Sequence, residues 1–109
     1  MGSGAMLVLT TCGNTEEAAG LAASLVDARL AACVNCVDGV TSTYRWRGAR
    51  QTNEEVLLLI KTTEDRLEAL QAKIRELSSY ELPEVLAVRV DGGLAAYLDW
   101  LRGAAASQE

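Results

Sequence analysis

The sequence contains no histidine and only one proline, Pro83. Without histidine, the chain cannot form a Ser–His or Cys–His nucleophile pair, an imidazole general base or a mixed Cys/His zinc site. No apolar run comes near the ~20 residues of a membrane span. The first residues, MGSGA, lack the charged start and the long apolar run of a signal peptide. The chain has three cysteines, and an odd count without a signal peptide favours a reducing, cytoplasmic setting. We therefore predict a cytoplasmic protein that does not associate with membranes.

Half of the 109 residues are apolar, and the net charge is −5. This length and composition predict one globular domain with a substantial core. The acidic balance argues against a broad surface for nucleic acid or anionic lipid, because the chain would not attract either. We expect the domain to span residues 6–103, with residues 1–5 a cloning remnant and residues 104–109 a frayed tail.

Periodic patterns predict a β-α-β-β-α-β order followed by a last helix. Strands are expected over residues 6–11, 33–48, 53–63 and 84–91, and helices over residues 15–32, 64–78 and 94–103. Asn14 and Glu17 form a capping-box pair for the first helix, and Thr63 can cap the second. Asp38-Gly39 suggests a bulge, and residues 47–52 a turn. The order predicts an α+β fold of the ferredoxin-like type: a two-layer sandwich with a long hairpin, two helices on one face and a C-terminal helix.

Two features of this sheet predict association with other copies of the chain. Each arm of the predicted hairpin has about a dozen residues and is therefore roughly 40 Å long, at ~3.3 Å per residue. A compact domain of this size has a diameter of only ~35 Å, so the hairpin should reach or project beyond the edge of its own domain. The run from Val56 to Ile60 is apolar on both faces, although helices would cover only one. Either a few aliphatic side chains stay exposed, or the open face packs against another subunit, which is the interpretation we favour.

Four stretches of the sequence carry a family resemblance. ARLAACVN (28–35), TSTYRWRG (41–48), EEVLLLIKT (54–62) and YELPEVLAVRVDGGLAAYLDWL (80–101) closely resemble the CutA family, small proteins long called divalent-ion tolerance proteins. The resemblance extends from Met6 to about Arg102, with its motifs in the same order. It implies a ferredoxin-like fold and a tight homotrimer, similar to that of PII signalling proteins, which bind small effectors in clefts between subunits.

The resemblance also implies copper as a candidate ligand, because the family is linked to copper tolerance. Cys33 matches the cysteine of the family's AACVN motif, and Cys12 lies where some members carry a second one. Thiolates suit copper, so these two residues and Glu81 are our candidate metal ligands. The alternative for Cys33 is a small buried hydrophobic residue between a helix and a strand. The family usually has His-Pro-Tyr-Glu where this chain has SSYE (78–81), and the missing imidazole predicts a weaker or displaced site.

Cys33 and Cys36 also form a C-x-x-C string. A redox C-x-x-C normally lies where a strand enters a helix, whose N-terminus lowers the thiol pKa. Here the string follows a helix and enters a strand, in which positions three apart point to opposite faces. We interpret this spacing as accidental.

The remaining site predictions concern the boundaries between subunits. By the resemblance, Lys61, Tyr80, Glu81 and Glu84 line a cleft for a small molecule, although an intersubunit salt bridge would equally explain them. Aromatic and aliphatic side chains are expected to anchor the trimer. The predicted interface residues are Tyr44, Trp46, Val56, Leu58 and Trp100.

These features predict a non-catalytic, cytoplasmic homotrimer that requires no cofactor. Its partners would be its own copies and copper, another divalent metal ion or a small molecule. The alternatives are a structural trimeric scaffold without a ligand and a PII-like effector-binding protein. An RNA-binding module of the same topology would need aromatic residues on its two central strands, and the expected strands 6–11 and 53–63 have none. A metallochaperone would need two cysteines in the first strand-to-helix loop, where only Cys12 is found.

Overall fold

Four antiparallel strands form the sheet of the computed structural model, which describes residues 3–107. The strands are β1 (Ala5–Cys12), β2 (Cys33–Trp46), β3 (Ala49–Thr63) and β4 (Leu86–Arg89), arranged in the order β2-β3-β1-β4. The helices are α1 (Thr15–Asp27), α2 (Leu67–Leu77) and α3 (Ala95–Ala104), with a 3₁₀ turn, η1 (Glu64–Arg66), before α2. The α+β class and the predicted order of elements are confirmed. In the described part of the chain, no helix is long and apolar enough to cross a membrane.

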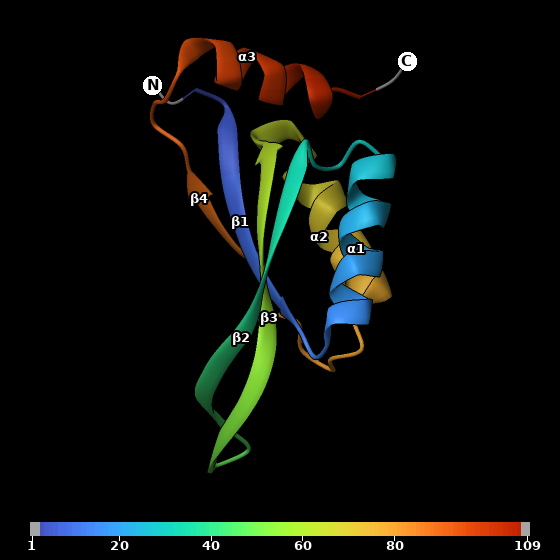
Figure 1. Cartoon of the computed structure of the whole chain (residues 1–109), viewed down its shortest axis with the longest axis vertical. Helices are drawn as coiled ribbons and strands as arrows, with labels where there is room; N and C mark the ends of the chain where they lie inside the picture. Colours follow the sequence, from blue (N-terminus) through green and yellow to red (C-terminus); the bar gives the residue numbers. More distant parts are fainter. Residues whose placement is uncertain (1–2, 108–109) are drawn as a thin grey trace.

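Helices α1 and α2 pack side by side on one face of the sheet, and the core lies between these layers (Figure 1). Strand residues alternate between the two faces, so every second side chain of β1 and β3 points to the helices. The most deeply buried core residues are Val8, Leu25, Leu58, Ile60, Leu70 and Ile74. Burial of apolar side chains at roughly 25 cal/mol per Å² is the main force that holds the two layers together.

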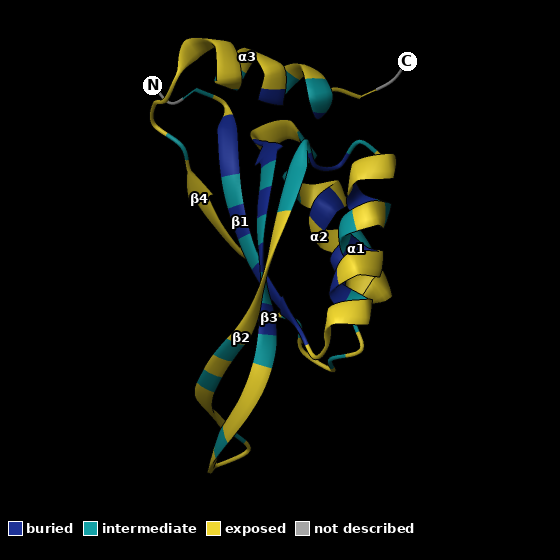
Figure 2. Cartoon of the chain, viewed as in Figure 1, coloured by how far each residue is buried: buried dark blue, intermediate teal, exposed yellow. Residues whose placement is uncertain are grey.

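The opposite face of the sheet is not covered by α1 or α2, and we call it the open face. Its apolar residues include Leu7, Leu9, Val37, Leu57, Leu59, Leu86 and Val88. On β4, Leu86 is 58% and Val88 is 53% exposed (Figure 2). The sequence-based prediction that the sheet is apolar on both faces is therefore confirmed for β1, β3 and β4.

The choice of β3 residues for the subunit interface was wrong. Val56 pairs with Cys12 and Leu58 with Thr10, so both point to the helices. They are 4% and 0% exposed and belong to the core of the single chain. Because strand side chains alternate, the β3 leucines on the open face are Leu57 and Leu59.

The hairpin of β2 and β3 is longer than predicted and extends beyond the helices (Figure 1). A two-residue turn connects its arms, and Arg47 and Gly48 have φ values of 51° and 81° there. This geometry is that of a type I′ turn, whose twist matches that of the strands. Strand β3 consequently begins at Ala49, and the predicted 47–52 turn is wrong. The predicted bulge is confirmed, since the register shifts between Val37 and Val40.

Two helix ends differ from the prediction. Helix α1 begins as expected, with the Asn14 side chain accepting a hydrogen bond of 2.8 Å from the Glu17 backbone N–H. It ends at Asp27 rather than near residue 32, because Arg29 adopts a left-handed φ of 58°. Before α2, the Thr63 hydroxyl donates to the Asp65 carboxylate at 2.6 Å and makes no capping bond to the backbone.

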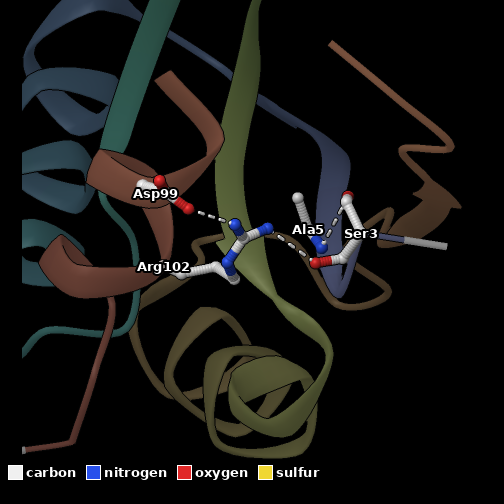
Figure 3. Close-up of polar contacts among 4 residues, drawn as sticks. All are labelled: Ser3, Ala5, Asp99 and Arg102. Atoms are coloured by element: carbon white, nitrogen blue, oxygen red, sulfur yellow. Dashed lines mark hydrogen bonds and ion pairs between the residues drawn. The ribbon is translucent and has the colours of Figure 1, made fainter. Parts of the chain in front are cut away.

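The described fold extends past the predicted domain limits of 6 and 103 at both ends. Ala5 is buried in β1, and Ala105 is buried just after α3. Arg102 of α3 donates hydrogen bonds to the Ser3 carbonyl oxygen at 2.8 Å and to the Asp99 carboxylate at 2.6 Å (Figure 3). These contacts hold α3 against the beginning of β1. Residues 1–2 of the predicted remnant and 108–109 of the predicted tail lie outside the described residues.

Candidate functional site

A groove of about 790 Å³ lies between the β2–β3 hairpin and the loop that leads from α2 to β4. Its lining combines three aromatic rings with three carboxylates. These residues are Tyr44, Trp46, Glu55, Tyr80, Glu81 and Glu84. We call it the groove; it includes three predicted cleft or metal residues, Tyr80, Glu81 and Glu84, and two predicted interface aromatics, Tyr44 and Trp46.

The bulge in β2 determines which hairpin residues face the groove. Val40 pairs with Glu55 and Tyr44 pairs with Gln51, so the even-numbered residues of β2 beyond the bulge share a face with Glu55. Glu55 in turn lies two residues before Leu57 on β3 and therefore points to the open face. The groove is thus continuous with the open face.

Tyr80 connects the loop to the sheet through a hydrogen bond from its hydroxyl to Glu55, 2.6 Å long. Burial and the adjacent Glu55 carboxylate raise the pKa of Tyr80 far above its ordinary value. Burial alone would raise the pKa of Glu55, but hydrogen bonds from Tyr80, Ser42 and Thr11 outweigh it, and the pKa is lowered. At neutral pH the groove therefore holds a neutral phenol donating to a charged carboxylate.

Glu17 holds the base of the same loop, a role that sequence reasoning missed. Its carboxylate accepts hydrogen bonds from the backbone N–H groups of Gly13, at 3.2 Å, and Ser79, at 3.1 Å. Burial alone would raise the pKa of Glu17, but its hydrogen bonds with Ser79 and Gly13 prevail and lower it. The capping-box pattern identified Glu17 as a helix residue, but nothing in that pattern indicates its contact with a loop 62 residues later.

Arg47 spans the end of the groove from the hairpin turn to the loop. Its Nη2 donates to both carboxylate oxygens of Glu81, at 2.9 and 2.8 Å. Its guanidinium carbon lies 5.3 Å from the centre of the Trp46 ring, within the range of a cation–π contact. A cation of this chain is therefore held between an aromatic ring and a carboxylate.

Within one chain, Lys61 does not line the groove with Tyr80, Glu81 and Glu84. A cleft that contains all four residues would need Lys61 from a neighbouring subunit, so that cleft stays a prediction. Lys61 is six positions beyond Glu55 on β3, roughly 20 Å away at ~3.3 Å per residue. Its ammonium group lies 3.4 Å from the Tyr97 hydroxyl and 5.6 Å from the centre of that ring. Tyr97 in turn packs against Trp100, a predicted interface residue that is 49% exposed on α3.

The predicted metal ligands Cys33, Cys12 and Glu81 do not meet in one chain. Within residues 3–107 there is no group of three or more cysteine, aspartate or glutamate side chains that could hold a metal ion. Cys12 is buried on the helix side of the sheet, and its burial and the charge of Glu17 raise the pKa of its thiol to about 11. A thiol that stays protonated at neutral pH is a poor metal ligand. The residues of a single chain therefore do not fit a copper centre.

Cys33 and Cys36 lie on opposite faces of β2, as the sequence predicted. Cys33 pairs with Lys61 on the open-face side and is half-buried, whereas Cys36 pairs with Leu58 on the helix side. Neither cysteine is in a disulfide. The C-x-x-C string is thus neither a chelating pair nor a redox pair in this fold.

Removing the Tyr80 hydroxyl should weaken the connection between the loop and the sheet. We expect Tyr80→Phe to lower the free energy of unfolding by about 1–2 kcal/mol, since a charged carboxylate loses a donor. Urea unfolding at a fixed protein concentration measures this loss. The matched control is Tyr44→Phe, which removes a hydroxyl that accepts a hydrogen bond from the neutral Asn53 side chain on the exposed hairpin. We expect this control to change the free energy of unfolding by no more than about 0.5 kcal/mol. Equal losses in the two variants would contradict a special role for the Tyr80–Glu55 pair.

Comparison with known proteins places the chain in a family. The family model described as CutA1 divalent ion tolerance protein matches residues 6–104. The chain belongs to the CutA1 family. The divalent-cation tolerance protein CutA of Thermus thermophilus is 45% identical over 96 residues, which cover 88% of this chain and 93% of that protein. The crystal structure of CutA from Xylella fastidiosa matches with a TM-score of 0.92 and 39% identity, covering 94% of this chain and 99% of that one.

The plant relatives of this CutA1 chain are longer. The rice protein CutA 1, named as chloroplastic, is 43% identical over 97 residues, which are 89% of this chain but only 55% of that protein. The chain therefore spans about half the length of the rice relative. The family assignment confirms the predicted resemblance, and the names of the family model and of the Thermus relative refer to divalent-ion tolerance.

Proposed function

We propose that this protein acts in divalent-cation tolerance as a non-catalytic homotrimer, with a ligand-binding cleft at each boundary between subunits. The observation that carries the proposal is that the groove and the exposed apolar residues share one face of the sheet. Apolar surface of this kind is favourable to cover, and a second copy that covers Leu86 and Val88 would also approach the groove. The groove would then become a cleft with walls from two subunits.

The fold supports this assembly. The strand order β2-β3-β1-β4 and the position of α1 and α2 on one face agree with the ferredoxin-like arrangement, which we infer for the chain. The outer half of the hairpin is exposed, and within residues 3–107 no other strand pairs with the free edge of β2 (Figure 2). A projecting hairpin with an open edge is a surface that proteins usually cover, and a neighbouring subunit would do so.

Within the cleft we propose a small molecule as the first candidate ligand and a divalent metal ion as the second. The aromatic and acidic lining of the groove supports the former. The name of the family supports the latter, but one chain does not supply three ligands, so a metal ion would need donors from two or more subunits. Cys33 is the cysteine suited to this, because it is half-buried on the open-face side.

Copper titration tests the second candidate. If Cys33 is a ligand, Cys33→Ala should weaken Cu(II) binding at least about tenfold. A tenfold loss of affinity corresponds to a loss of ~1.4 kcal/mol in binding free energy. Isothermal titration calorimetry of both proteins measures the change. Cys36→Ala is the control, because Cys36 points to the helix side, and it should leave the affinity unchanged. An unaltered titration curve for Cys33→Ala would show that Cys33 is only a packing residue.

Two alternatives stay distinguishable from this proposal. A trimer whose melting temperature is raised by neither metals nor small effectors would be a structural scaffold, since any ligand of the native state increases apparent stability. A trimer stabilised by small effectors alone would be a PII-like effector-binding protein. Cytoplasmic location stays a prediction, and the name of the rice relative assigns that protein to the chloroplast.

A further inference from the structure

The groove has the lining of a site for a positively charged organic molecule. Glu55, Glu81 and Glu84 contribute three carboxylates, and no lysine or arginine is among the residues that line it within the described part of the chain. Tyr44, Trp46 and Tyr80 contribute aromatic rings, whose negative faces attract cations. Rings and carboxylates together favour an organic cation over a hydrated metal ion, because a metal ion gains nothing from the apolar part of the lining.

The side chain of Arg47 shows how such a cation is held. Its guanidinium lies over Trp46 at 5.3 Å and donates to both oxygens of Glu81 at 2.9 and 2.8 Å. Arg47 and Glu81 are 69% and 70% exposed, respectively. Ion pairs at such exposed positions contribute little to stability, so a ligand could displace Arg47 without a large cost.

We propose that the groove binds an organic cation with a guanidinium or ammonium group, and that Arg47 is the internal competitor of this ligand. The inference rests on the proposed ligand cleft and names the class of its ligand. The cation would take the place of the Arg47 guanidinium between Trp46 and Glu81, with its remainder along Tyr44 and Tyr80. Glu84 has no hydrogen bond or ion pair within residues 3–107 and is available for a second positive group.

Calorimetric titration with agmatine tests the inference, because agmatine joins a guanidinium to an ammonium through a short alkyl chain. Removing the competitor should tighten binding at least about fivefold in Arg47→Asn. Asparagine tolerates the left-handed φ at this position, and Asn-Gly is the favoured type I′ turn, so the hairpin is kept. Glu84→Gln, which does not alter the turn, should weaken binding at least about fivefold. Succinate, of similar size and opposite charge, should not bind.

The control for the change in net charge is Arg50→Asn, on the exposed part of β3 in the same hairpin. Its affinity for agmatine should stay within about twofold of the unmodified protein. Equal tightening in Arg50→Asn and Arg47→Asn, or no agmatine binding by Arg47→Asn, would overturn the inference.

Sedimentation of the same samples gives the mass of the protein and distinguishes a failure of this inference from a failure of the proposed trimer. A trimer that does not bind agmatine contradicts the cation ligand and leaves the assembly in place, and so does a trimer that binds only Cu(II). A monomer that binds agmatine with the expected responses supports the cation site and contradicts the proposed trimer.

Discussion

Placing two aspartates on the open face, as Leu86→Asp/Val88→Asp, should convert the proposed trimer into monomers at micromolar concentration. In the single chain both side chains are more than half exposed, so the change should leave the fold of one subunit intact. In the trimer each subunit would have to bury two carboxylates without partners, and each unpaired charge costs several kcal/mol. The loss of association is the largest effect on assembly that we expect from any surface substitution.

Sedimentation velocity of the variant measures this effect, and the helix layer offers a matched control. Val26 on α1 and Leu77 on α2 are 41% and 40% exposed on the other side of the molecule. Val26→Asp/Leu77→Asp adds the same charge there and should remain trimeric. A variant with aspartates on the open face that sediments like the unmodified protein would show that this face is not the interface.

Shortening a core residue should have the largest effect on the stability of the fold. We expect Leu58→Ala to lower the free energy of unfolding by about 2–5 kcal/mol, because it leaves a cavity under α1 and α2. Leu58 has no exposed surface in the single chain. The mass of the folded protein should stay that of the proposed trimer, because Leu58 faces the helices of its own chain.

Urea unfolding and sedimentation on the same samples distinguish a core role from an interface role. Leu77→Ala is the matched control: it removes the same atoms from a side chain that is 40% exposed and should cost less than about 1 kcal/mol. If Leu58→Ala instead lost the trimer and kept its stability, the position of Leu58 in the core would be wrong.

Much of the fold could be predicted because its signals are local. The Asn14 cap, the bulge at Asp38-Gly39 and the alternation of elements depend on residues close together in sequence. The family resemblance was equally accessible, since its motifs are contiguous stretches. The side of β3 that faces the helices could not be predicted in the same way. The run from Val56 to Ile60 is apolar throughout, so its periodicity does not distinguish the two faces of the strand. Val56 and Leu58 were assigned to the wrong face for this reason.

The site was predicted less completely, because its residues come from distant segments. Tyr80, Glu81 and Glu84 lie together in the groove of the single chain, but the roles of Glu55 and Glu17 were missed. Glu55 lies in the middle of β3 and Glu17 in the first turn of α1, and only the tertiary fold brings these two acids to the loop. Lys61 does not line the groove of its own chain, and motif matching alone gives no distance along a strand.

Sedimentation equilibrium of the unmodified chain at micromolar concentration tests the central claim most directly. A homotrimer predicts a mass three times the chain mass of 11.6 kDa, independent of moderate dilution. A single species of 11.6 kDa would contradict the subunit interface on the open face and, with it, the cleft between subunits.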